Sequence, residues 1–153
     1  MKVRLGTLLA TGILGLIVTS TLNATGVANQ NSAAHSYIGK PSNIPGVLAV
    51  KSAEVIELAN YDEEMVIFDA RSEAQRNKGK IRWSERFELE QLTAKHLENT
   101  VASKTTVVLF YGDKKDRKAA MGAKVAVSKG YNKVYWLQGG WSEWQQSGLR
   151  LDM

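Results

Sequence analysis

Three short, continuous apolar runs constrain the fold of this sequence more than any other feature. They are Met65–Phe68, which is closed by Asp69, then Val107–Tyr111 and Val134–Leu137. A run of this length without alternating polar positions is typical of a strand that is buried on both faces, as in a parallel sheet. We therefore expect a compact α/β domain with a largely parallel central sheet.

Helical segments are expected between these runs. The expected elements are, in chain order, a strand over 47–50, a helix that begins near Ser52, a helix over 93–99 and a helix over 117–129. Ser52 is a favourable N-cap residue, and Gly130 is typical of the position that follows a helix. Because strands and helices alternate, the loops that follow the three runs should meet at the carboxyl edge of the sheet, where ligands of such sheets bind.

The front of the chain has the order of a secretory signal peptide. Lys2 and Arg4 precede an apolar run, and Gly26 and Ala28 occupy the two small-residue positions of a cleavage site. We expect a signal peptide over 1–28, a flexible leader over 29–46 and one folded domain over 47–153, in a periplasmic or secreted protein. After cleavage no stable membrane anchor would remain. The alternative is that the segment is retained as a membrane anchor, although its apolar run is shorter than a spanning helix, which needs about 20 residues.

Composition excludes several classes of function. The chain contains no cysteine, which excludes disulfides, zinc-thiolate sites and every thiol nucleophile. Removing Lys2 and Arg4 from the 20 basic residues leaves 18 basic against 15 acidic residues, so the positive excess is small. The sequence has no basic stripe with interleaved aromatic residues, and we therefore expect no binding to nucleic acid. His35 and His96 are isolated from each other, so we expect no metal site, and no motif indicates a cofactor.

Three motifs follow one another along the chain. They are VIFDARSEAQRNKGKI, VVLFYGDKKDRKAAMGAKVAVSKGYNKVYWL and QGGWSEW. In this order they resemble the rhodanese-like family, whose opening pattern is matched by Asp69, Arg71 and Glu73, whereas Lys80 replaces the histidine of that pattern. The resemblance covers about 47–149 and implies a rhodanese-like three-layer α/β domain with a largely parallel central sheet.

Active members of that family carry a nucleophilic cysteine at the first position of a six-residue loop that often ends with arginine. When Arg117 is matched to this arginine, the loop comprises Gly112, Asp113, Lys114, Lys115, Asp116 and Arg117, and Gly112 takes the place of the cysteine. Counting backwards from Gly130 places Tyr111 there instead. Neither residue can form the persulfide of a sulfurtransferase, so the resemblance implies a degenerate, non-catalytic domain.

The loop could still bind a ligand. Backbone amides at a helix N-terminus, together with the cationic side chains of the loop, predict binding of a small oxyanion or of a protein partner at residues 112–117, and the family resemblance gives Asp69 and Arg71 the role of bracing the loops. The alternative for the loop is that its charges are solvated and only promote solubility. The alternative for the function is a sulfurtransferase component that uses a thiol supplied by a partner protein.

Overall fold

The computed structural model describes residues 38–61, 64–114 and 117–150. Six strands form one sheet: β1 (Lys40–Pro41), β2 (Val47–Val50), β3 (Met65–Asp69), β4 (Glu85–Arg86), β5 (Val107–Tyr111) and β6 (Val134–Leu137). Their order in the sheet is β1-β2-β6-β5-β3-β4. All neighbouring strands are parallel except β1 and β2, which pair antiparallel. The expected strands and the largely parallel sheet are confirmed.

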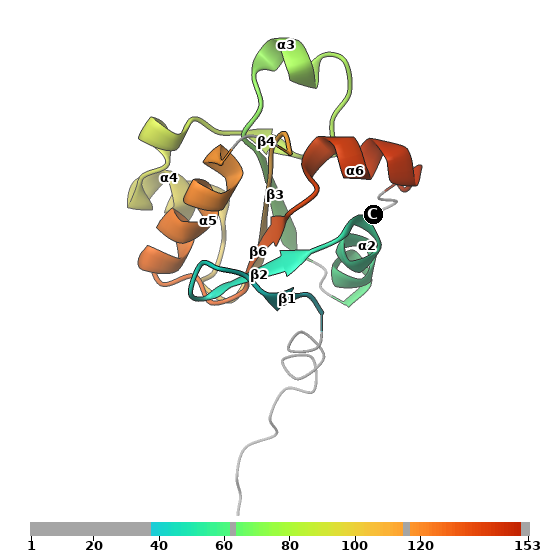
Figure 1. The fold of residues 1–153 in the computed structure, drawn as a ribbon. Coiled ribbons are helices and arrows are strands. Elements are labelled where there is room, and N and C mark those ends of the chain that lie inside the picture. Colours follow the sequence, from blue (N-terminus) through green and yellow to red (C-terminus); the bar gives the residue numbers. More distant parts are fainter. Residues whose placement is uncertain (1–37, 62–63, 115–116, 151–153) are drawn as a thin grey trace, which may run out of the picture.

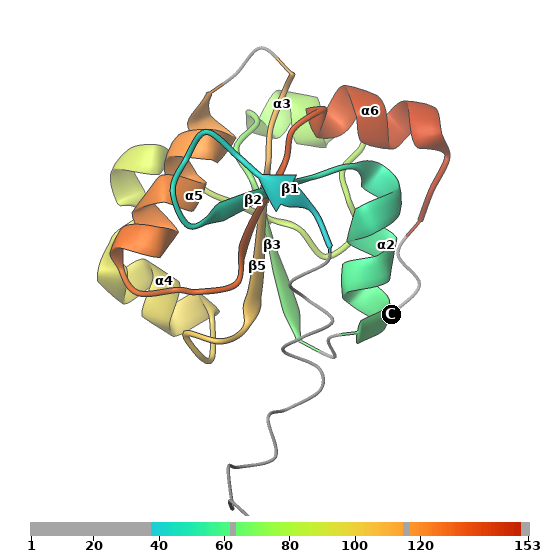
Figure 2. The same cartoon turned by 60° about the horizontal axis from the view of Figure 1, so that its bottom comes forward.

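Helices cover both faces of the sheet, which gives three layers (Figures 1 and 2). The helices are α2 (Ser52–Tyr61), α3 (Glu73–Arg76), α4 (Ala94–Thr100), α5 (Lys118–Ser128) and α6 (Gly140–Ser147), and a 3-10 turn, η1, spans Leu89–Gln91. Helices α4 and α5 lie on one face and α2 and α6 on the other, while α3 stands above one edge of the sheet. The part of the chain that the structure describes contains no helix long and apolar enough to cross a membrane.

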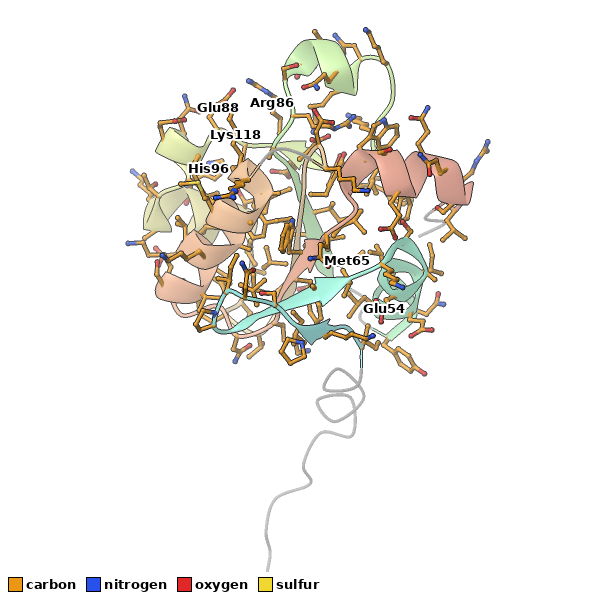
Figure 3. The ribbon with its side chains drawn as sticks, viewed as in Figure 1. Glu54, Met65, Arg86, Glu88, His96 and Lys118 are labelled. Carbon is orange, nitrogen blue, oxygen red and sulfur yellow. The ribbon has the colours of Figure 1, made fainter. Side chains whose placement is uncertain are left out.

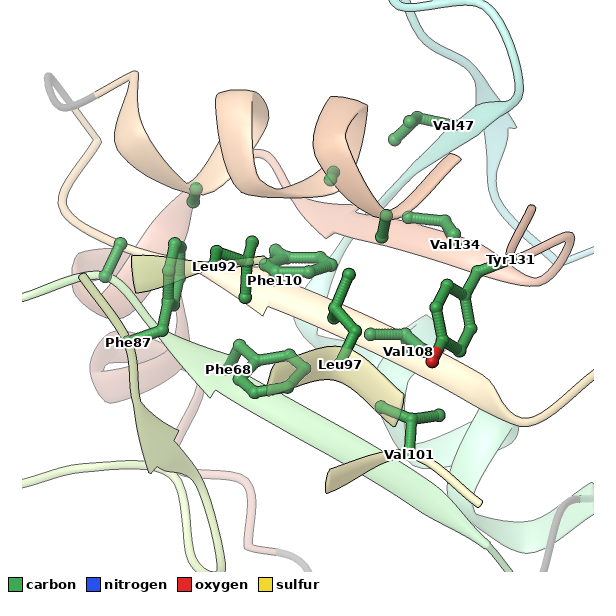
Figure 4. Packing of buried hydrophobic residues seen from close by; sticks show 14 residues of the cluster. Val47, Phe68, Phe87, Leu92, Leu97, Val101, Val108, Phe110, Tyr131 and Val134 are labelled. Carbon is green, nitrogen blue, oxygen red and sulfur yellow. The ribbon is translucent and has the colours of Figure 1, made fainter. Parts of the chain in front are cut away.

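The core on the α4 and α5 face is built around aromatic rings from three segments (Figure 4). Phe68 and Phe110 from neighbouring strands stack with ring centroids 5.1 Å apart, and Phe87 meets Phe110 edge-on at 5.4 Å. Gly122 of α5 makes this packing possible, because a Cβ atom at that position would lie 2.7 Å from the Phe87 ring. The absence of a side chain at Gly122 therefore sets how closely α5 approaches the sheet.

The core on the α2 and α6 face is mainly aliphatic. Val55 and Leu58 of α2 pack with Ile67 and Leu109 of the sheet and with Trp144 of α6. The same helices are joined by a polar contact. Ser52 begins α2 and directs both its backbone N–H and its hydroxyl to the Glu143 carboxylate of α6, at 2.9 and 3.2 Å. Ser52 was expected as an N-cap, but its hydroxyl links two helices instead.

The structure describes residues 38–46 of the segment in which we expected a flexible leader. Residues 40–41 form β1 on the edge of the sheet, with Lys40 opposite Ala49. Ile38 is 5% exposed and packs in the α2 and α6 core, because the edge strand carries it over that face. The signal peptide expected over 1–28 and the leader residues before Ile38 lie outside the described residues.

Candidate functional site

The loops that follow β3 and β5 meet at the carboxyl edge of the sheet. In the parallel register of the two strands, Asp69 lies opposite Tyr111. The backbone N–H of Ala70 then donates to the Tyr111 carbonyl at 2.8 Å, so the segments that follow β3 and β5 stay hydrogen-bonded as they leave the sheet. This edge is the place where ligands of parallel sheets bind.

Asp69 and Arg71 form a buried, bidentate ion pair. The Arg71 Nε and Nη2 atoms donate to the two Asp69 carboxylate oxygens at 3.1 and 2.8 Å, and both side chains are almost completely buried. Arg71 Nη2 also donates to the Gly79 carbonyl at 2.9 Å. Burial disfavours the charged form of Arg71, but the hydrogen bond and the charge of Asp69 outweigh it and raise the pKa of the guanidinium. The pair thus connects the end of β3 with the segment that follows α3.

The Tyr111 hydroxyl connects several segments at this edge, a role that the sequence did not predict. Its hydroxyl donates to the Asp69 carboxylate, accepts the Ile81 backbone N–H at 3.1 Å and pairs with the Ser84 hydroxyl at 3.0 Å. Burial, followed by the hydrogen bond to Asp69, raises the pKa of Tyr111 to about 12. The sequence did contain a signal for this role, because a tyrosine at the end of a buried apolar run places a hydroxyl where it needs a hydrogen-bond partner.

Arg76 is a second residue that the sequence analysis missed. Its Nη1 atom lies 3.3 Å from the Asp69 carboxylate, and its Nη2 atom donates to the Ser84 carbonyl at 3.0 Å. The side chain is 8% exposed. Two buried guanidinium groups, Arg71 and Arg76, therefore share the buried Asp69 carboxylate. The exposed Glu73 carboxylate lies 3.8 Å from Arg76 Nε and is a further partner of that guanidinium.

The loop after β5 begins at a buried glycine. A Cβ atom at Gly112 would lie 3.4 Å from the Ala70 Cβ and 3.5 Å from the Ala119 Cβ, which are ordinary contact distances. The Gly112 carbonyl accepts the Trp141 backbone N–H at 2.8 Å. This contact needs Gly140, whose φ is +60° and where a Cβ would lie 2.3 Å from the Gly112 oxygen. The loop is thus fixed to the start of α6.

The structure brings together only part of the predicted loop site. Asp113 accepts a hydrogen bond from the Gln75 side chain, which ties the loop to α3. Lys114 and Arg117 are exposed, and Arg117 occupies the N-cap position of α5. Lys115 and Asp116, the remaining members of the predicted loop site, lie outside the described residues.

The described histidines and carboxylates form no candidate metal centre. Across residues 38–61, 64–114 and 117–150, no group of three or more His, Cys, Asp or Glu side chains could hold a metal ion. Figure 3 shows His96 on α4, on the side of the molecule where Arg86 and Glu88 form an ion pair. His35 lies outside the described residues.

Comparisons with known proteins agree with this architecture. The model of the rhodanese-like domain family matches residues 52–147. The rhodanese-like domain of a protein from Anabaena sp. has a TM-score of 0.56 at 20% identity, covering 67% of this chain and 76% of that one. An As-Sb reductase from Leishmania major has a TM-score of 0.54 at 22% identity, covering 65% and 77%. These likenesses concern the fold. A search of curated proteins found no match.

Proposed function

The chain belongs to the family of rhodanese-like domains, and we propose that it is an exported, non-catalytic member that binds a small oxyanion through the loop 112–117. The observation that carries this proposal is Gly112. It is the first residue after β5, it is buried, and a Cβ atom there would fit in ordinary contact with Ala70 and Ala119. Tyr111, the other position considered for the lost cysteine, has its hydroxyl engaged by Asp69 and Ser84.

The proposed loss of sulfurtransferase activity follows from the absence of a thiol. Sulfur transfer through a persulfide requires a thiolate that attacks the sulfur donor and then releases the sulfur to an acceptor. The chain has no cysteine, and glycine offers no other nucleophile at this position. The persulfide route is therefore closed to this chain, which supports binding as its function.

Charge and geometry support an oxyanion as the ligand. Lys114 and Arg117 are exposed on the loop at the start of α5, where backbone N–H groups favour negative charge. A tetrahedral or trigonal anion of the size of sulfate would combine these amides with the Lys114 and Arg117 side chains without a covalent bond. Export rests on the signal peptide predicted over 1–28.

Amide chemical shifts of the mature chain, titrated with sodium thiosulfate or sodium sulfate against sodium chloride at equal ionic strength, test the proposal. We expect saturable shifts at Gly112, Lys114 and Arg117. The variants Lys114→Ala and Arg117→Ala should each weaken binding about fivefold, whereas Lys95→Ala, an exposed lysine on α4, should not. Shifts that fail to saturate, or that spread equally over all surface lysines, would contradict oxyanion binding.

A thiocyanate assay tests the absence of catalysis separately. The mature chain, incubated with thiosulfate and cyanide, should form no more thiocyanate than a buffer blank. Turnover above the blank in protein free of other sulfurtransferases would show that the non-catalytic assignment is wrong, whatever the titration gives.

A further inference from the structure

A second candidate site lies between α6 and the segment that follows α3. It is a hollow of about 560 Å³. Its lining includes three apolar side chains, Trp141 and Trp144 of α6 and Leu149 beyond it, and three cationic side chains, Lys80, Arg82 and Arg150. None of the described loop residues, 112–114 and 117, takes part in the lining, so we treat the hollow as a site of its own.

The charged side chains in the described lining of the hollow are all cationic. All three cations are exposed, and within the described part of the chain the lining includes no aspartate or glutamate. These cations attract carboxylates, while Trp141 and Leu149 in the same lining favour an aliphatic or aromatic group. The combination fits a segment in which acidic residues flank an apolar one.

The turn that carries Arg82 extends this surface with an exposed tryptophan. The Ser84 N–H donates to the Ile81 carbonyl at 3.1 Å and closes the turn. Trp83 is 47% exposed and has a φ of +57°, a conformation that is rare for a bulky side chain. The Arg82 guanidinium lies over the Trp83 ring, 4.5 Å from its centroid. Strained, exposed positions of this kind cluster at functional sites.

Buried contacts hold the turn in place from both ends. The Tyr111 hydroxyl accepts the Ile81 N–H and pairs with the Ser84 hydroxyl, and Arg76 donates to the Ser84 carbonyl. The turn is therefore ordered before any partner arrives, which lowers the entropic cost of binding. Tryptophan and arginine on an ordered turn are the residue types that dominate the energy of protein interfaces.

We infer that the turn 81–84 and the hollow form one docking surface for an acidic peptide segment of a partner protein. Carboxylates of the segment pair with Lys80, Arg82 and Arg150, and an apolar side chain between them enters the hollow against Trp141. Trp83 lies outside the lining of the hollow and adds a contact that a peptide reaches more readily than a small ligand. This inference goes beyond oxyanion binding and does not depend on it.

Fluorescence anisotropy with a labelled peptide tests the inference on the mature chain. The probe is the octapeptide Glu-Glu-Leu-Glu-Glu-Phe-Glu-Glu, compared with a peptide in which serine replaces the leucine and the phenylalanine. We expect saturable binding of the first peptide that weakens with salt, and at least tenfold weaker binding of the second. No binding of the first peptide, or equal binding of both, would overturn the proposal, the latter by indicating a general anion site.

Matched variants locate the surface. Arg82→Glu should weaken binding at least tenfold, whereas the charge reversal Lys95→Glu on the exposed side of α4 should leave it within twofold. Trp83→Gly removes the side chain and relieves the positive φ, so we expect weaker peptide binding without a fall in melting temperature. Lys114→Ala should bind the peptide as the parent does, which separates this surface from the oxyanion loop. Equal effects of Arg82→Glu and Lys95→Glu would contradict the assignment.

Discussion

The hydroxyl of Tyr111 donates a hydrogen bond to the carboxylate of Asp69, although the two residues are 42 positions apart in the sequence. They lie opposite each other where β5 and β3 end. Because the same hydroxyl also holds Ile81 and Ser84, this pair determines the position of the turn that carries Trp83. Stability and a proposed binding surface therefore depend on one phenol group.

Tyr111→Phe should destabilise the domain. The substitution removes the donor to Asp69 and the acceptor for the Ile81 N–H, and a buried polar group left without a partner costs about 1 to 3 kcal/mol. We expect the melting temperature, measured by circular dichroism, to fall by at least about 4 °C. Tyr61→Phe is the control, since Tyr61 is 56% exposed. Equal melting temperatures for both variants would contradict the role of the network.

The contribution of Tyr111 should also depend on pH. Burial raises its pKa to about 12, above the about 10 of an unfolded tyrosine, so the folded state keeps the proton where the unfolded state has lost it. The stabilisation is present below pH 10 and is lost as the pH rises from 10 to 12. In urea unfolding at several alkaline pH values, the difference in unfolding free energy between the parent and Tyr111→Phe should decrease as the pH rises. A difference that stays constant over this pH range would contradict the prediction.

Gly140→Ala should be far more damaging than Gly148→Ala. Both glycines have positive φ values, +60° and +65°, but an added Cβ meets the Gly112 oxygen at 2.3 Å in the first case and nothing within 4 Å in the second. Gly148→Ala should therefore cost only backbone strain, about 1 kcal/mol. Gly140→Ala must in addition displace α6 from the loop and should cost several kcal/mol in thermal unfolding. Similar costs would mean that the close approach is unimportant.

Ile38→Ala should destabilise the domain by about 2 kcal/mol, because it removes buried apolar surface from the α2 and α6 core. Asn43→Ala, at an exposed position of the same segment, is the matched control. Chemical denaturation of both variants measures the difference. If Ile38→Ala unfolds like the parent, the segment before β1 contributes nothing to the fold.

Gly112→Cys should fold and give a reactive thiol. The Cβ fits beside Ala70 and Ala119, and the start of α5 with Lys114 and Arg117 should lower the pKa of the thiol below about 8.5. We expect iodoacetamide to react severalfold faster at pH 7 than with Asn99→Cys, an exposed position on α4. A faster reaction at Tyr111→Cys would move the lost nucleophile by one residue, and slow reaction at both would argue against an anion-binding loop.

The sequence predicted those elements whose signal is local. The apolar runs over 107–111 and 134–137 became β5 and β6 with the expected bounds, and Gly130 follows α5 with a φ of +88°. The short strands β1 and β4 were missed, because two paired residues leave no periodic pattern. The contacts of Tyr111 and Arg76 were missed because their partners come from separate segments, and only the folded sheet edge brings these together.

Trp141 contacts the loop of one proposed site and lines the other. Its backbone N–H binds the Gly112 carbonyl at 2.8 Å, its indole lines the hollow beside α6, and the Arg71 guanidinium lies 4.4 Å from the centroid of its ring. A peptide that shifts this residue would alter the loop, and an anion that shifts the loop would alter the hollow. Thermodynamic linkage then requires each ligand to change the affinity for the other by the same factor. One residue would thereby couple two ligands that bind at different places on the domain.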